Sequence, residues 1–287
     1  LPTNMLANYD FRTYTLSGAN VIDSDGDVIF TTIGSGNISF TSAEGVYTSS
    51  DPDRYLSKSD GLLPIPSGNF SLEFYIKFGP ITTNVDHVFF QYNAGADITM
   101  EGFIGQDGKL YFQTRNGPNN LRLVYFDPFD TEATLANWDS TNFNHFVITW
   151  DGSGTEKLYH DGSLVTKNLT QYSGNVSYGQ NLTFATLYLG GAFPGVPRDN
   201  IDDTIKFHRL YDGALSPADV SYLFDNREVS GVFKDVTNYA LVSNNATGTE
   251  TRWLSVVPAP TVIPITDFTL PTNMLANYDF RTYTLSG

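Results

Sequence analysis

The densest group of potential metal ligands is a loop of three aspartates, Asp23, Asp25 and Asp27, spaced two residues apart around Gly26. Carboxylate oxygens at this spacing could be presented together to Ca²⁺, a hard cation that takes about six to eight oxygen ligands. The loop is not an EF-hand, because Gly34 stands where the bidentate glutamate would be. The alternative is an Asp-Gly hairpin between two apolar strands, made soluble by its acids. Calcium is therefore the one candidate cofactor.

Sugar binding is a second chemistry that the composition allows. Exposed aromatic rings can pack against the apolar face of a sugar, and the chain has 17 Tyr, 21 Phe and 3 Trp. Trp138, Tyr125 and Tyr172 are candidates, although most aromatic side chains are expected in the core. No glycan site is assigned. A further polar loop precedes the expected strand 205–209, and we interpret it as a solvated turn. Its residues are Arg198, Asp199, Asn200, Asp202 and Asp203.

Catalytic chemistry finds little support in the sequence. Hydrolysis of a glycosidic bond needs two carboxyl groups that flank the bond. No two glutamates have the spacing that would place such a pair on one strand, and Glu73 has only Ser71 and Tyr75 beside it on its face. The four histidines show no metal-binding spacing. They are His87, His145, His160 and His208. We therefore expect that the protein is not an enzyme.

Six Asn-x-Ser/Thr sequons are present, and this number has little weight in a chain so rich in Asn, Ser and Thr. If the chain passes through a eukaryotic secretory pathway, we expect modification of the sequons in loop-like contexts. These are Asn37, Asn168, Asn175 and Asn245. Asn69 and Asn181 stand at expected strand starts and are poorer acceptors.

The elements that would position these residues are mostly strands. Residues 70–78 alternate between apolar and polar side chains, which is typical of a strand with one buried face. Asp107-Gly108 and Asp161-Gly162 each stand between apolar runs and predict β-hairpins. A helix is predicted after Ser216, because a hydroxyl N-cap, a proline and an acid follow one another there. Many short strands and one short helix indicate an antiparallel β-sandwich.

Five segments of the chain follow a recognisable order. They are the strand 69–77, the strand 145–152 ending in Trp-Asp-Gly, the hairpin 157–162 with Leu-Tyr-His-Asp-Gly, the strand 187–191 and the Arg-Leu-Tyr-Asp-Gly-Ala-Leu-Ser segment 209–216. In this order they resemble the concanavalin A-like jelly rolls, in their laminin-G-like branch. The resemblance implies an antiparallel sandwich over most of the chain. It implies no single function, since this sandwich hosts lectins, glycosidases, receptor-binding modules and inert spacers.

The two ends of the chain carry the same sequence. Residues 1–18 and 270–287 both read LPTNMLANYDFRTYTLSG, a match at all 18 positions. We interpret the match as a tandem array whose unit is 269 residues long. The alternative is an engineered permutation or an artefact of how the chain was made. Residues 257–269 contain three prolines, which favour an extended spacer, with an edge strand as the alternative.

The overall composition excludes several classes of partner. The net charge of −15, from 16 basic and 31 acidic side chains, argues against nucleic acid and against anionic membrane surfaces. The absence of cysteine removes disulfides and thiolate metal sites. No run of about 18 apolar residues is present, so we expect no membrane insertion. Because the sequence begins with Leu1, we expect it to be part of a longer chain.

Together these features predict an all-β sandwich at 1–228, extra edge strands or a connector at 229–256, a proline-rich linker at 257–269 and the start of the next repeat at 270–287. We predict a non-catalytic structural or adhesive repeat of a long extracellular or surface filament, sheath or adhesin, with neighbouring copies as partners. Residues 1–18 would help to join neighbours by β-strand addition. The alternative is a lectin module that binds glycans through calcium or an aromatic platform.

Overall fold

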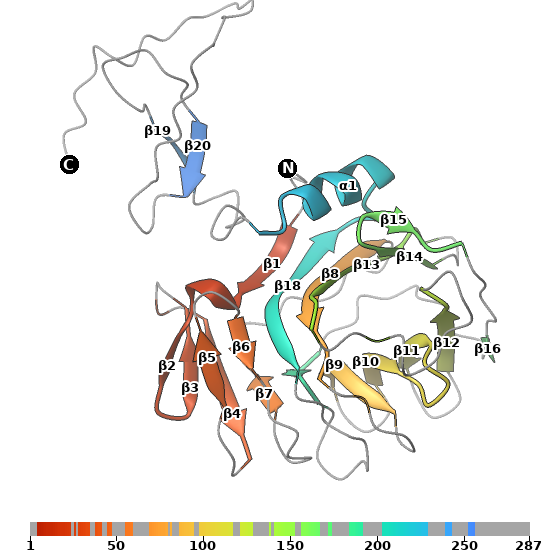
Figure 1. Cartoon of the computed structure of the whole chain (residues 1–287), viewed down its shortest axis with the longest axis horizontal. Helices are drawn as coiled ribbons and strands as arrows, with labels where there is room; N and C mark the ends of the chain where they lie inside the picture. The colour runs from red at the N-terminus through yellow and green to blue at the C-terminus, as the bar shows by residue number, and fades with distance from the viewer. Residues whose placement is uncertain are drawn as a thin grey trace, which may run out of the picture. The chain divides into compact units, whose positions relative to one another are not determined.

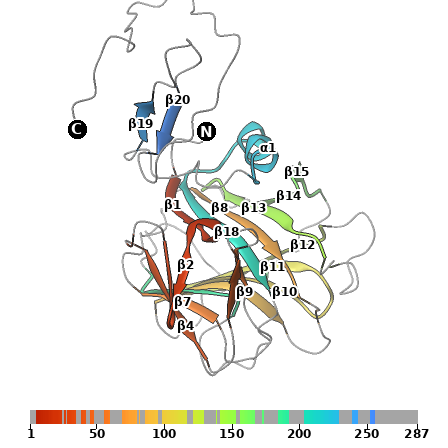
Figure 2. The same cartoon turned by 60° about the vertical axis from the view of Figure 1, so that its left-hand side comes forward.

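Two antiparallel sheets packed face to face make up most of the computed structural model (Figures 1 and 2). The chain divides into two units, Leu1–Ser230 and Gly231–Gly287. The structure describes residues 5–23, 26, 28–34, 38–41, 45–47, 55–59, 69–79, 81, 86–94, 98–116, 121–128, 138, 141–152, 156–166, 172–173, 184–191, 203–228, 239–242 and 252–255.

Sheet one is built around three long strands that lie side by side in Figure 1, namely β13 (Asn144–Trp150), β8 (Phe70–Lys77) and β18 (Thr204–Asp212). In spatial order its described strands are β15 (Ser163–Leu164), β14 (Glu156–His160), β13 (Asn144–Trp150), β8 (Phe70–Lys77), β18 (Thr204–Asp212), β6 (Gly45–Tyr47) and β5 (Ser39–Thr41). The strand β1 (Met5–Asp10) also pairs with β18. Strands from the beginning and the end of unit 1 therefore meet at the middle of this sheet.

Sheet two runs from one edge of the sandwich to the other. Its described strands, in spatial order, are β16 (Tyr172–Ser173), β12 (Leu121–Phe126), β11 (Leu110–Asn116), β10 (Ile98–Ile104), β9 (His87–Asn93), β17 (Thr186–Leu189), β7 (Tyr55–Lys58), β4 (Ile29–Ile33), β3 (Asn20–Ile22) and β2 (Thr15–Ser17). The short helix η1 (Phe11–Thr13) connects β1 of sheet one to β2 of sheet two, so the N-terminal segment crosses between the layers. In the described part of unit 2, β19 (Tyr239–Val242) pairs with β20 (Arg252–Ser255).

The core lies between the two sheets and is rich in aromatic rings. The apolar face predicted for residues 70–78 is confirmed, because Leu72, Phe74 and Ile76 of β8 belong to this core. The prediction of a single buried face is wrong, because Ser71 and Glu73 on the opposite face are buried as well. Phe74 stacks on Phe90 of β9, with 4.6 Å between ring centroids. Each such ring removes a large apolar surface from water, which is the main force that holds the two layers together.

The turns and the helix form where the sequence predicted them. Gly108 between β10 and β11 has a φ of 80°, and Asp161 and Gly162 between β14 and β15 have φ of 48° and 77°. Asp161 and Gly162 form a two-residue hairpin turn, in which both central residues need this left-handed backbone. The turn between β10 and β11 is longer, because Ile104 pairs with Leu110, and only Gly108 is left-handed in it. The helix α1 (Pro217–Asp225) is capped by Ser216, whose side chain accepts a hydrogen bond from the backbone of Asp219. The protein is thus an all-β antiparallel sandwich with a short helix, as predicted. Within the described residues, no helix is both long and apolar enough to cross a membrane.

Candidate functional site

A row of polar side chains crosses the outward face of sheet two, the face turned away from the core. Glu101 of β10 stands opposite Gln91 of β9 and Gln113 of β11. The amide Nε2 of Gln91 donates to Oε2 of Glu101, and that of Gln113 donates to Oε1, both at 2.7 Å. Glu101 is only 1 % exposed, whereas Gln113 is partly exposed. The buried carboxylate therefore fixes the orientation of two amides, of which that of Gln113 is partly open to solvent.

A row of aromatic rings lies next to the polar row. Phe103 of β10 stacks on Tyr111 of β11 at 4.9 Å, and Tyr111 lies 5.4 Å from Tyr125 of β12. Tyr111 and Tyr125 are both partly exposed. The ammonium of Lys109 lies 4.9 Å from the centre of the Tyr125 ring. This arrangement holds two tyrosines in fixed positions on a face that solvent reaches.

The hydrogen bond between Tyr111 and Asp107 anchors the aromatic row. The Tyr111 hydroxyl donates to Oδ2 of Asp107 at 2.9 Å. Burial, and after it the hydrogen bond to Asp107, raises the pKa of Tyr111, so its phenol stays protonated at neutral pH. Burial alone would raise the pKa of Asp107, but hydrogen bonds from Lys109 and Tyr111 outweigh it and lower the pKa. Asp107 is therefore ionised and accepts the hydrogen bond that the Tyr111 hydroxyl donates.

The polar row continues on its other side into a pair of tyrosines. Tyr188 of β17 stands opposite Gln91, and its ring lies 5.3 Å from that of Tyr55 of β7, edge to face. On β11, Arg115 follows Gln113 on the same face and is partly exposed. Its Nε is buried and has no hydrogen-bond partner among the described residues. Fixed amides, an unpartnered guanidinium donor and aromatic rings are the groups that bind sugar hydroxyls and the apolar faces of sugar rings.

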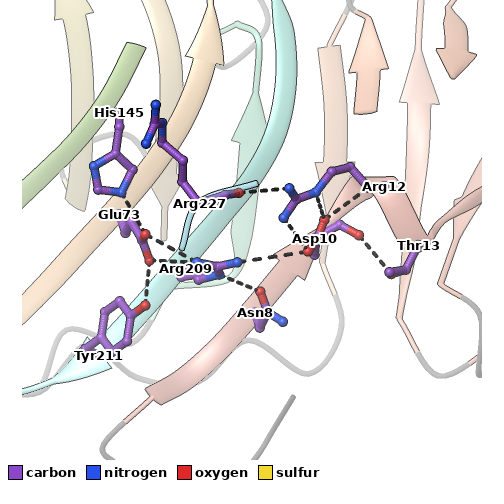
Figure 3. A network of polar contacts seen from close by, with 9 residues as sticks. All are labelled: Asn8, Asp10, Arg12, Thr13, Glu73, His145, Arg209, Tyr211 and Arg227. Carbon is purple, nitrogen blue, oxygen red and sulfur yellow. Dashed lines mark hydrogen bonds and ion pairs between the residues drawn. The ribbon is translucent and has the colours of Figure 1, made fainter. Parts of the chain in front are cut away.

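A second polar cluster lies on the outward face of sheet one, around Glu73 of β8 (Figure 3). Its two carboxylate oxygens each lie 3.2 Å from Nη1 of Arg209. They also accept hydrogen bonds from Nε2 of His145, at 2.8 Å, and from the Tyr211 hydroxyl. The ring of Phe224 on α1 lies 5.8 Å from that of His145, so the helix covers part of this face.

Side chains of the N-terminal segment extend the Glu73 cluster (Figure 3). Arg209 Nε donates to Oδ1 of Asn8 at 3.0 Å, and its Nη2 lies 3.9 Å from Oδ2 of Asp10. Arg12 binds Asp10 through Nε and Nη2, at 2.7 and 2.8 Å. Its Nη1 donates to the backbone carbonyl of Arg227 at 2.8 Å. Alternating charges therefore connect β8, β18, β1 and the residues after α1.

The Glu73 cluster is not an active site. Glu73 and Arg209 are both 0 % exposed, so no substrate reaches them. Burial alone would raise the pKa of Glu73, but Arg209 and the hydrogen bond from His145 outweigh it and lower the pKa to about 2. An ionised, sealed carboxylate is no general acid. The strand neighbours of Glu73 supply no second carboxylate; Asp10, which comes from β1, lies on the other side of Arg209.

The histidines all lie on strands. His208 of β18 is fully buried, where burial lowers its pKa to about 3. Its Nδ1 donates to the carbonyl of Glu73 at 3.2 Å, so its neutral Nε2 accepts from the Tyr92 hydroxyl at 2.7 Å. Among residues with described positions, no three His, Asp or Glu side chains come together in a way that could hold a metal ion.

The predicted calcium loop is described only in part. Asp23 closes a hairpin between β3 and β4, since its Oδ1 accepts from the backbone N–H of Val28 at 3.1 Å. Gly26 adopts a φ of 81° in this turn. The hairpin expected as the alternative is therefore present. Asp25 and Asp27 lie outside the described residues, and calcium stays a prediction.

The other predicted site residues have different outcomes. Trp138 is 6 % exposed and donates its indole N–H to the carbonyl of Gly108 at 2.8 Å, so it is a core residue and not a sugar platform. Tyr125 lies in the aromatic row, and the backbone of Tyr172 pairs with Leu123 at the end of the polar row. Asp203 is buried and accepts from the backbone N–H of Gly79. The remaining predicted residues lie outside the described part. They are Asn37, Asn168, Asn175, Asn245, Arg198, Asp199, Asn200 and Asp202.

Sequence reasoning missed the row of Gln91, Glu101 and Gln113. The hairpin signal at Asp107-Gly108 predicts that β10 and β11 pair, but the register needs the structure. A two-residue turn there would place residue 101 opposite residue 114, whereas the observed three-residue turn places it opposite residue 113. Gln91 could not be found in this way, since it depends on the pairing of β9 with β10.

A sequence profile described as the concanavalin A-like lectin/glucanases superfamily, laminin-G type, matches residues 48–221. The chain belongs to this superfamily. The match contains β7–β18, and hence the polar row and the aromatic row of sheet two. No curated protein matches the chain in sequence.

Solved structures share the fold of this superfamily member at low sequence identity. The receptor-binding domain of botulinum neurotoxin D superposes with a TM-score of 0.54 at 14 % identity, over 88 % of this chain and 64 % of that one. A botulinum neurotoxin type C structure, described by its dependence on two ganglioside molecules for cell entry, gives 0.54 at 13 %, over 88 % and 61 %. The sialidase of Trypanosoma rangeli gives 0.52 at 12 %, over 79 % and 33 %. The chain thus spans less than two thirds of each of these proteins.

Proposed function

We propose that this superfamily member is a non-catalytic module that binds glycans on the outward face of sheet two. The observation that carries the proposal is the row in which Glu101 holds the amides of Gln91 and Gln113 in place. Two partly exposed tyrosines, Tyr111 and Tyr125, lie beside it. Preorganised polar groups beside aromatic rings bind a sugar without first having to be ordered, which lowers the entropic cost of binding.

The arrangement of carboxylates supports binding over hydrolysis. Both oxygens of Glu101 accept hydrogen bonds from amides, and both oxygens of Glu73 bind Arg209. Glycoside hydrolysis needs one carboxyl that can give up a proton and a second about 5 to 10 Å away, both open to the substrate. The superposed neurotoxin D structure is a receptor-binding domain, and the type C structure is described by its ganglioside interaction, which favours the same conclusion.

A glycan array probed with the full chain tests this proposal. We expect binding to a restricted set of glycans, and a loss of about tenfold or more for Gln113→Leu and Tyr125→Ala, because each removes a direct contact. The matched control is Tyr222→Ala on α1. It removes a tyrosine that is 42 % exposed and lies on the side of sheet one, away from the proposed site on sheet two. The proposal would be contradicted if the wild type bound no glycan on the array, or if all three variants lost binding to the same extent.

The identity of residues 1–18 with 270–287 favours a second candidate function. In this proposal the chain is one repeat of a long extracellular or surface filament, sheath or adhesin, and its neighbours are copies of itself. Repeats that each bind glycans would gain avidity through effective concentration, so the two functions are compatible. The intact mass of the denatured native polypeptide tests it. A mass several times the 31.7 kDa of this chain supports the array, and a mass near one unit contradicts it.

A further inference from the structure

The partly exposed groups on the outward face of sheet two follow one strand. Arg115, Gln113 and Tyr111 are alternate residues of β11, so they share this face, and all three are partly exposed. Tyr125 of the neighbouring β12 stands opposite Tyr111 and is partly exposed as well. The facing residues of β10 are buried instead, and they are Thr99, Glu101 and Phe103. A ligand on this face therefore lies along β11 and β12, which are adjacent in Figure 1.

The guanidinium of Arg115 carries a charge that no carboxylate of the described residues balances. Its Nε is buried without a hydrogen-bond partner, and no ion pair among the described side chains includes it. Its neighbours across the two strand pairs, Thr99 and Leu121, are uncharged. Other described cations differ, because a carboxylate pairs with each of them. The pairs are Arg12 with Asp10, Lys109 with Asp107, Lys206 with Glu228 and Arg209 with Glu73.

An anion that contacts Arg115 would balance this charge. A guanidinium that is partly removed from water loses hydration, and without a counter-ion nothing compensates for the loss. Glu101 of the same face does not supply the counter-ion, because its two oxygens accept from the amides of Gln91 and Gln113. The planar N–H groups of arginine match two oxygens of a carboxylate or phosphate, and sulfate presents its oxygens in the same way as phosphate. The exposed part of Arg115 is therefore suited to a carboxylate or a sulfate.

The spacing along β11 sets a lower limit on the size of the ligand. Strand residues rise about 3.3 Å each, so the Cα atoms of Arg115 and Tyr111 are about 13 Å apart. This distance exceeds the width of one sugar ring, so a ligand that contacts both residues contains at least two sugars. Gln113 lies between them on the same face, where its amide can bind sugar hydroxyls.

We infer that the glycan bound on this face is an acidic oligosaccharide. Its carboxylate or sulfate contacts Arg115, and a neutral sugar of the same molecule packs against Tyr111 and Tyr125. This inference rests on the proposed function and names its class of ligand. The net charge of −15 repels densely charged polymers, so a single acid group beside neutral sugars is favoured over a polyanion.

Matched pairs of glycans test the inference on the full chain. The array carries carboxylated oligosaccharides beside their methyl esters, and sulfated oligosaccharides beside their desulfated forms. We expect the acidic form to bind about tenfold or more tightly than its neutral partner, because a hydrogen bond to a charged group contributes at least that factor. A loss of binding on methyl esterification assigns a carboxylate, and a loss on desulfation assigns a sulfate.

Substitutions of Arg115 locate the preference on the protein. Arg115→Gln should bind the acidic and neutral forms alike, and Arg115→Lys should retain part of the preference, since it keeps the charge but not the planar fork. The matched control is Lys157→Gln, which removes the same charge from an exposed position on β14 of sheet one. It should leave the preference for the acidic form unchanged.

The outcomes separate this inference from the proposed function. If the wild type binds neutral glycans as tightly as their acidic partners, or if Arg115→Gln keeps the preference, the inference is overturned and glycan binding stands. If the wild type binds no glycan of either form, both are overturned. The comparison of the two forms on the wild type needs no variant, so it decides the question even if a substitution prevents folding.

Discussion

Replacement of Glu73 by glutamine tests the role assigned to the buried charge cluster. In the wild type this carboxylate accepts from Arg209, His145 and Tyr211, and its pKa falls from an ordinary 4.5 to about 2. At about 1.4 kcal/mol per pKa unit, this shift corresponds to about 3 kcal/mol of stability at neutral pH. Loss of one partner of a buried ion pair costs about the same, 3 to 5 kcal/mol. We therefore expect Glu73→Gln to lower the free energy of unfolding by about 3 kcal/mol at pH 7.

The pH dependence provides a sharper test, and its sign follows from the direction of the shift. The folded pKa lies below the unfolded one, so the contribution of Glu73 is complete above pH 4.5 and is lost as the pH falls towards 2. Between these limits the unfolded chain takes up a proton that the folded protein does not. The free energies of unfolding of wild type and Glu73→Gln should therefore differ by about 2 kcal/mol less at pH 3 than at pH 7.

Urea unfolding at pH 7 and pH 3 measures both quantities. Tryptophan fluorescence reports on unit 1 when Trp253 is replaced by Phe in all chains, since Trp138 and Trp150 are buried there. The matched control is Glu228→Gln, which removes a mostly exposed carboxylate paired with Lys206 and should cost less than about 1 kcal/mol. A cost below about 1 kcal/mol for Glu73→Gln at pH 7, or the same cost at both pH values, would refute the reasoning.

Three further predictions concern single positions. Gly102→Ala should lower the free energy of unfolding by about 1 to 3 kcal/mol in urea titrations, because the added methyl overlaps the rings of Phe89 and Phe90. Ser216→Ala should cost about 1 kcal/mol by the same measurement, since the capping box of α1 loses its acceptor, and Ser216→Thr should retain most of the stability. If calcium binds at the Asp23 loop, a chelator should lower the melting temperature of the wild type but not that of Asp23→Asn, and identical shifts in differential scanning calorimetry would exclude calcium there.

The sequence by itself determined the local elements. The alternation of β8, the two Asp-Gly turns and the capped helix each depend on residues a few positions apart, whose backbone preferences act before any tertiary contact forms. The ordered set of such segments also sufficed to recognise the superfamily, which the match over residues 48–221 confirmed. The identity of the two ends needed no structure at all.

Only the tertiary structure decided which side chains meet across the sheets. Glu73 and Arg209 are 136 positions apart, and Asn8 and Arg209 are 201 apart, yet β1, β18 and β8 lie next to one another. The order of strands in a sheet follows from the packing of the whole chain, and no local pattern encodes it. The sequence left Trp138 open as a candidate sugar platform for the same reason, because the burial of a residue outside the strands depends on what packs against it. Local residue preferences therefore determined the strands, turns and helix, and long-range strand pairing determined the candidate site.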